Sequence, residues 1–171
     1  IVGVARTKPS MSKSGMLNTG ILRLHNVYGP HSDLSLDRSQ VIPATIRKAI
    51  LYPEERFLIW GNGEQNRSFI YVTDVVEGLL LVADKGINKG PIQLGTNEKT
   101  TINQIAEMTM EVSGKDIVKE HDLTKPVGDF GRAADITLAK EILGWEPTVS
   151  MKDGIKKTYD WAEKFLKTHE L

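Results

Sequence analysis

Two arginines of the sequence stand in settings that suit the binding of a diphosphate. Arg67 follows a Gly-Asn-Gly turn at 61–63, and Arg132 lies in the loop sequence GDFGR. A planar guanidinium can donate two parallel hydrogen bonds to a phosphate, and glycines let a ligand approach the backbone closely. The alternative is that each arginine is a surface residue paired with a neighbouring carboxylate, such as Glu64 or Asp135.

The elements that would position these arginines alternate between strands and helices. Strands are predicted over 21–25, 57–60, 67–72 and 91–95, with a further strand within 116–121. Helices are predicted over 42–51, 74–85, 105–114 and 137–143, with a last one opened by Ser150 and Asp153. The strands 57–60 and 67–72 flank the glycine turn. This alternation indicates an α/β protein.

Several local signals refine these elements. A capping box begins at Thr101 ahead of the helix 105–114, and Thr73 or Asp74 is expected to cap the helix 74–85. That helix is apolar enough to be buried on more than one side. Asp74 is therefore interpreted as a structural residue, and Trp145 is expected to pack against the final helix.

Composition excludes several classes of function. The chain has 171 residues, and its 22 basic and 22 acidic side chains cancel, so any anion must be bound locally. The absence of cysteine excludes disulfides, cysteine-rich zinc sites and thiol catalysis, and the cytoplasm is the expected compartment. The histidines at 25, 31, 121 and 169 lack ligand spacing, so no metal site is expected, and no apolar run is long enough to span a membrane.

Three sequence blocks carry a resemblance to a known family. They are RLHNVYGP at 23–30, WGNGEQNRSFIYVTDVVEG at 60–78 and LGWEP at 143–147. In this order they resemble the extended short-chain dehydrogenases/reductases, the NAD-dependent sugar-nucleotide epimerases and dehydratases. The resemblance implies a partial Rossmann-type α/β fold whose C-terminal portion has a small mixed substrate-binding lobe. Residues 20–171 would form that nucleotide-sugar-binding portion, and 1–19 would be an atypical N-terminal segment.

The resemblance also implies roles for individual residues. It assigns both arginines to the substrate diphosphate and Asn26 to the diphosphate or the sugar, although an asparagine at a strand end can also bond its own backbone. Trp60 and Gln65 would lie near the base and ribose, where an aromatic face and an amide suit a planar ligand. Trp60 could equally belong to the core. Tyr28 would lie beside the nicotinamide of the cofactor, or serve only to shape its turn.

The family's catalytic signatures are missing from the sequence. There is no GxxGxxG array, and the tyrosines at 28, 52, 71 and 159 are followed four residues later by Ser, Arg, Val and Glu instead of lysine. No catalytic residue is assigned, and the NAD(P) that the family implies is not expected to bind this chain alone. The blocks look most like GDP-mannose 3,5-epimerases, but Gln40 takes the place of a catalytic lysine there, which argues against that particular epimerisation.

The expected function is therefore the nucleotide-sugar-binding half of an epimerase or dehydratase, inactive without a cofactor domain from missing residues or a partner chain. The alternatives are a stand-alone nucleotide-binding or oligomerisation module, or a truncated gene product without a function of its own. The strands 21–25 and 91–95 resemble strands of a large parallel sheet, which is normally covered on both faces. Their exposure predicts a homo-oligomer through this region. Neither nucleic acid nor a membrane is an expected partner.

Overall fold

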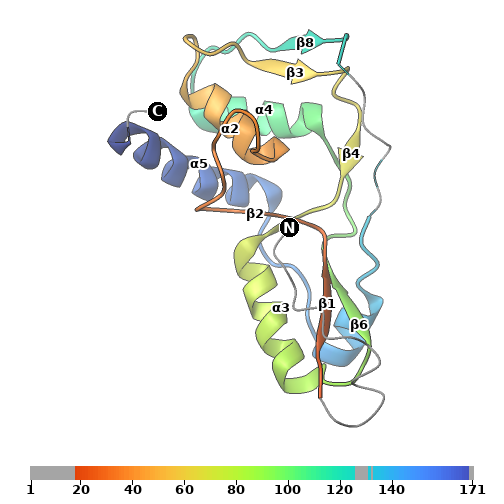
Figure 1. Cartoon of the computed structure of the whole chain (residues 1–171). Coiled ribbons are helices and arrows are strands. Elements are labelled where there is room, and N and C mark those ends of the chain that lie inside the picture. Colours follow the sequence, from red (N-terminus) through yellow and green to blue (C-terminus); the bar gives the residue numbers. More distant parts are fainter. Residues whose placement is uncertain (1–17, 126–130, 132, 170–171) are drawn as a thin grey trace.

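The computed structural model describes residues 18–125, 131 and 133–169. Figure 1 shows two lobes, one above the other. The three-helix lobe contains α2 (Val41–Ile50), α4 (Ile102–Ser113) and α5 (Met151–Thr168), with β3 (Leu58–Trp60) and β8 (Glu120–Asp122). The sheet lobe contains β1 (Ile21–Leu24), β6 (Pro91–Leu94), α3 (Val72–Lys85) and the π-helical turn η1 (Ala139–Leu143). The predicted α/β class is confirmed.

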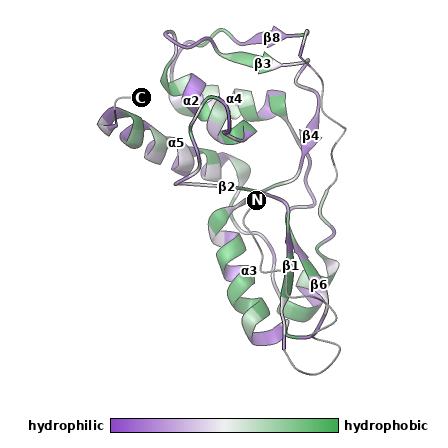
Figure 2. Ribbon diagram, in the orientation of Figure 1, coloured by the Kyte–Doolittle hydropathy of each residue, from purple (hydrophilic) through white to green (hydrophobic). Residues whose placement is uncertain are grey.

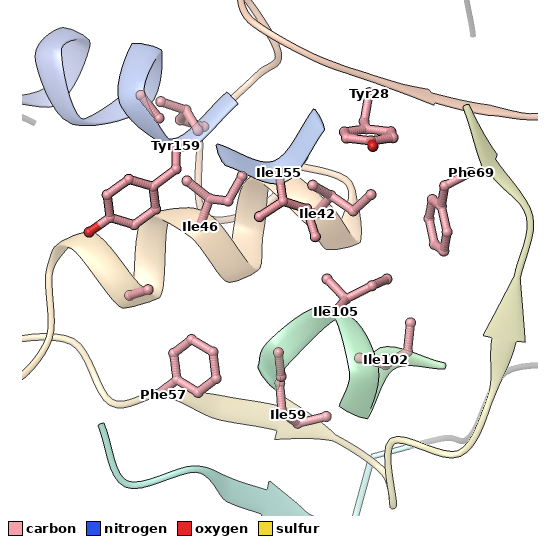
Figure 3. Close-up of a cluster of buried hydrophobic side chains, with 14 of the residues drawn as sticks. Tyr28, Ile42, Ile46, Phe57, Ile59, Phe69, Ile102, Ile105, Ile155 and Tyr159 are labelled. Carbon is pink, nitrogen blue, oxygen red and sulfur yellow. The ribbon is translucent and has the colours of Figure 1, made fainter. Parts of the chain in front are cut away.

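The core of the three-helix lobe forms where the apolar faces of its helices meet. Figure 3 shows this first cluster, with Ile46 and Ile105 pointing inward from different helices above Phe57. Apolar residues recur at helical spacing in each of these helices, which gives each helix one face to bury. The labelled members are Tyr28, Ile42, Ile46, Phe57, Ile59, Phe69, Ile102, Ile105, Ile155 and Tyr159.

The sheet lobe is built on the parallel pair of β1 and β6, in which Leu22 lies opposite Ile92. This confirms the strands predicted at 21–25 and 91–95 and their place in a parallel sheet. A second cluster covers one face of the pair and includes side chains from α3 and η1. Its buried members are Leu22, Ile70, Val75, Val82, Ile92, Leu94, Ala134, Ile136, Ala139, Leu143 and Trp145.

The expected strand over 67–72 is instead divided at Ser68. β4 (Asn66–Arg67) pairs antiparallel with β7 (Thr100–Thr101), whereas β5 (Phe69–Tyr71) pairs parallel with β2 (Asn26–Tyr28). The strands before and after the glycine turn, β3 and β4, do not pair with each other: β3 pairs with β8, and β4 pairs with β7. After this change of sheet, β5 lies between the two clusters, with Phe69 in the first and Ile70 in the second.

The predicted cap of α3 is wrong. The helix begins at Val72 with Tyr71 as its N-cap residue, and no side chain caps it. The Asp74 carboxylate bonds a distant segment instead: Oδ1 accepts from the Thr148 amide and hydroxyl, and Oδ2 accepts from the Val149 amide. The structural role expected for Asp74 therefore holds, but it is a tertiary role.

A second expectation for α3 also fails, since among the described residues only one of its faces is covered. Val75, Gly78 and Val82 are buried, whereas Val76, Leu79 and Leu80 are exposed. Figure 2 shows the apolar character of α3 over much of its length. None of the described helices combines the length and apolar character that crossing a bilayer requires.

Candidate functional site

Asn26 lies where the two lobes join, at the start of β2 and opposite Phe69. Its Nδ2 donates to the Ser68 carbonyl over 2.9 Å. Ser68 is fully buried, and its hydroxyl bonds Thr96, donating to the carbonyl at 2.9 Å and accepting from the amide at 3.1 Å. The Asn26 side chain is therefore fixed beside the chain that carries Arg67, and it is exposed to solvent.

Arg67 is half-buried in β4, opposite Thr100. Its Nη1 donates to the carbonyl of Asn66 over 2.8 Å, which turns the guanidinium back along its own strand. The neighbouring Asn66 receives the Gly131 amide on its Oδ1 at 3.1 Å. A Cβ on residue 131 would overlap the Asn66 carbonyl, so this approach requires glycine.

Arg132 lies outside the described residues, but its surroundings on both sides are described. Gly131 bonds Asn66, and the Ala134 amide donates to the carbonyl of Thr96 over 3.1 Å. These two contacts hold Gly131 and Ala134 near the Asn66–Ser68 run. No pattern in the sequence pointed to Thr96 or Asn66, because their partners lie 28 and 65 residues away.

Trp60 lies at the end of β3 and is a surface residue, because 56% of it is exposed. The Lys125 ammonium stands 5.3 Å from its ring centroid, an attractive cation–π arrangement. Gln65 Nε2 donates to the Trp60 carbonyl over 3.3 Å, whereas Gln65 Oε1 is buried without a hydrogen-bond partner among the described residues. The indole ring of Trp60 is thus open to solvent, whereas the Gln65 amide oxygen lies buried beneath the surface.

Tyr28 faces away from this surface. It is buried, its hydroxyl donates to the Met151 carbonyl over 3.4 Å, and its ring meets Tyr71 edge to face at 5.6 Å. The structure thus gives the side chain a packing role between β2 and α5.

Replacement of Tyr28 by phenylalanine is expected to change how stability depends on alkaline pH. Burial, followed by the nearby charges of Tyr71, Asp74 and Asp153, raises the pKa of Tyr28 above its ordinary value. The unfolded chain releases this proton above about pH 10 while the folded chain retains it, so the stabilisation is complete below that pH and is lost as the pH rises toward the folded-state pKa. The free energy of unfolding, measured with urea, should fall between about pH 10 and 11, and Tyr28→Phe should reduce this fall by up to about 1.4 kcal/mol per pH unit. Parallel curves for the two proteins would contradict this.

A separate open groove of about 620 Å³ lies between β7, α4 and the start of α5. Its lining includes the carboxylates of Glu98, Glu107 and Glu111 and the ammonium of Lys99. Its predominantly negative lining is unsuited to a diphosphate. The candidate site is therefore the run from Trp60 to Ser68 together with Asn26.

Comparison with known proteins decides the family. The NAD dependent epimerase/dehydratase family profile matches residues 6–95. The chain belongs to this family. Its fold is therefore related to that of the NAD-dependent sugar-nucleotide epimerases and dehydratases, and the predicted Rossmann-type relationship is confirmed.

Relatives in this family differ in substrate. The chain is 36% identical over 142 residues to GDP-mannose 3,5-epimerase 1 of Oryza sativa subsp. indica, covering 83% of this chain and 37% of that protein. It is 32% identical over 142 residues to GDP-L-fucose synthase 1 of Arabidopsis thaliana, covering 81% of this chain and 44% of that protein.

Among solved structures, UDP-glucose 4-epimerase of Thermotoga maritima with UDP-glucose has a TM-score of 0.81 and 35% identity, covering 91% of this chain and 49% of that one. UDP-glucuronic acid 4-epimerase of Bacillus cereus, in complex with NAD, has a TM-score of 0.69 and 29% identity, covering 85% and 44%. The chain spans less than half the length of each of these members of the epimerase/dehydratase family.

Proposed function

We propose that the chain is the nucleotide-sugar-binding part of an NAD(P)-dependent sugar-nucleotide epimerase or dehydratase. Arg67 and Arg132 would bind the diphosphate, and Asn26 would contact the diphosphate or the sugar. Trp60 and Gln65 would bind the base and ribose. The T. maritima relative was solved with UDP-glucose, which supports a nucleotide sugar as the ligand class.

The observation that supports this proposal is that Gly131 and Ala134 bond Asn66 and Thr96. Asn66 directly precedes Arg67, so these two described residues, which flank position 132 in the sequence, contact the surroundings of Arg67. Two guanidinium groups supplied from adjacent segments suit the two negative charges of a diphosphate. The net charge of zero leaves such local groups as the means of binding an anion.

Catalysis would require a cofactor domain that binds NAD(P) and contributes the tyrosine–lysine pair. This domain would belong to the same polypeptide or to another. The chain spans less than half of its relatives, which leaves room for such a part. The uncovered face of α3 and the two-stranded parallel sheet of β1 and β6 support association at this lobe, with a cofactor part or with a second copy. Sedimentation of the chain as a monomer at every concentration would argue against self-association.

Calorimetric titration with UDP-, GDP- and dTDP-sugars, and with NAD, tests the proposed function. Wild-type protein should bind a nucleotide sugar, and Arg67→Ala should weaken binding about 10- to 100-fold, the usual effect of losing a charge-assisted hydrogen bond. Arg38→Ala is the matched control, since Arg38 is an exposed arginine that pairs with Asp33 and Asp37 outside this site. Failure of the wild type to bind any nucleotide sugar would refute the proposal. Tight NAD binding would refute the assignment of the cofactor to another part.

A further inference from the structure

Asn103, in the first turn of α4, holds the glycine turn with its side-chain amide. Nδ2 donates to the Asn62 carbonyl over 3.0 Å and to Glu64 Oε1 over 2.7 Å. Oδ1 lies 2.9 Å from His121 Nε2 and 3.5 Å from Lys119 Nζ, both of which can donate to it. Every hydrogen-bonding position of this amide is therefore engaged, on one side by the turn and on the other by the β8 region.

The backbone at the start of α4 holds the same turn. The Ile102 amide donates to the Gln65 carbonyl over 3.2 Å, and the Asn103 amide donates to the Gly63 carbonyl over 3.0 Å. The next amide, that of Gln104, donates to the Thr101 hydroxyl of the capping box over 3.1 Å. These amides would otherwise lack partners at a helix start. The first two are directed at the protein's own turn, and the third is directed at the capping hydroxyl, instead of at an anion.

The fit between the turn and Asn103 also determines which residue can stand at position 63. Gly63 has φ of +74°, which favours glycine, and a Cβ there would collide with the Asn103 side chain. The turn and the first turn of α4 therefore fit each other directly. Trp60 precedes this turn and Gln65 ends it, so its conformation sets how both side chains are presented.

We propose that Asn103 is a positioning residue for nucleotide binding. It fixes the turn at 61–65 so that the Trp60 ring and the Gln65 amide are held in place before the ligand arrives. This inference rests on the proposed function, because it assumes that these two side chains contact the nucleotide. Preorganisation of this kind raises affinity without any contact between Asn103 and the ligand.

The test compares Asn103→Ala and Asn103→Asp with Glu111→Gln. The aspartate variant keeps size and acceptor oxygens but removes the donors to Asn62 and places a like charge beside Glu64. Glu111, nearer the other end of the same helix, pairs with Lys152 of α5. Nucleotide-sugar affinity is measured by calorimetry, and backbone amide exchange is measured by mass spectrometry over the turn.

Both Asn103 variants should weaken nucleotide-sugar binding about tenfold and speed amide exchange over residues 61–65 by a similar factor, while Glu111→Gln changes neither. The amides of Gly61 and Glu64, which donate to the Asp122 carbonyl and to Asn62 Oδ1, are the reporters. Wild-type affinity together with unchanged exchange in Asn103→Asp would overturn the inference and leave the proposed function intact. If the wild type binds no nucleotide sugar, the proposed function and the binding role of Asn103 fail together, and exchange alone decides whether Asn103 orders the turn.

Discussion

Replacement of Asp74 by alanine is expected to lower the free energy of unfolding by about 3 kcal/mol, because it removes hydrogen bonds to a buried charge and leaves their donors unpaired. Asp74 is 2% exposed, and its carboxylate accepts from the Thr148 amide and hydroxyl and from the Val149 amide at 2.9–3.2 Å. These bonds attach the start of α3 to the segment that leads into α5. Their loss should therefore loosen the connection between the two lobes.

Urea unfolding measures this effect, with the midpoint and the slope fitted separately. Asp84→Ala is the matched control, because Asp84 is an exposed aspartate near the other end of the same helix. Its replacement should change stability by less than about 0.5 kcal/mol. If Asp74→Ala cost no more than the control, the bonds to Thr148 and Val149 would not contribute to the stability of the fold.

Replacement by alanine is expected to lower stability strongly at Trp145 and hardly at all at Trp60. Trp145 is 1% exposed, belongs to the second cluster, and donates from Nε1 to the Asp74 carbonyl over 3.0 Å. Trp145→Ala should destabilise the protein by about 4 kcal/mol through the cavity that it creates. Trp60→Ala removes an exposed ring and should change stability by less than about 0.5 kcal/mol.

Nucleotide-sugar binding should instead be weakened by replacement of Trp60 and not by replacement of Trp145, when it is measured under conditions in which both variants are folded. Trp60→Ala should weaken binding, because stacking on an aromatic ring contributes to base recognition. Trp145→Phe, which keeps an aromatic ring in the core, should bind as the wild type does. Loss of binding in the Trp145 variant alone would contradict the assignment of Trp60 to the site and of Trp145 to the core.

Local signals in the sequence predicted much of this fold correctly. The Thr101–Gln104 capping box forms in both directions, and the Ser150 hydroxyl accepts from the Asp153 amide. Gly114 ends α4 with φ of +65°. Each of these features depends on residues a few positions apart, so the pattern of residue types was sufficient to place them.

Features that depend on distant residues could not be predicted in the same way. The Asp74 carboxylate looked like a cap for its own helix, but its partners lie 74 and 75 residues away. The division of the strand at 66–71 is decided by β7 and β2, which the alternating pattern does not encode. Likewise, the apolar pattern of α3 does not identify the face that is left uncovered.

Residue types and the family resemblance selected candidates for the site, but they did not predict how these candidates are arranged. The resemblance selected Asn26, Trp60, Gln65 and Arg67, and the structure places them along one run of chain and its neighbouring strand. The exposure of Trp60 resolves the choice between a surface and a core residue. Lys125 and Asn103 were missed, because nothing in the sequence indicates that they meet the turn from 65 and 41 residues away.

The change of sheet at Ser68 also bears on how the length of this chain can vary. Asn66 and Arg67 belong to one sheet and Phe69 to another, with Ser68 fully buried between them and bonded to Thr96. An inserted or deleted codon here could not be absorbed by a loop, and it would shift the register of one sheet relative to the other. Residues 36–38, by contrast, are exposed within a surface loop, so length variation during evolution should accumulate there and spare residues 66–69.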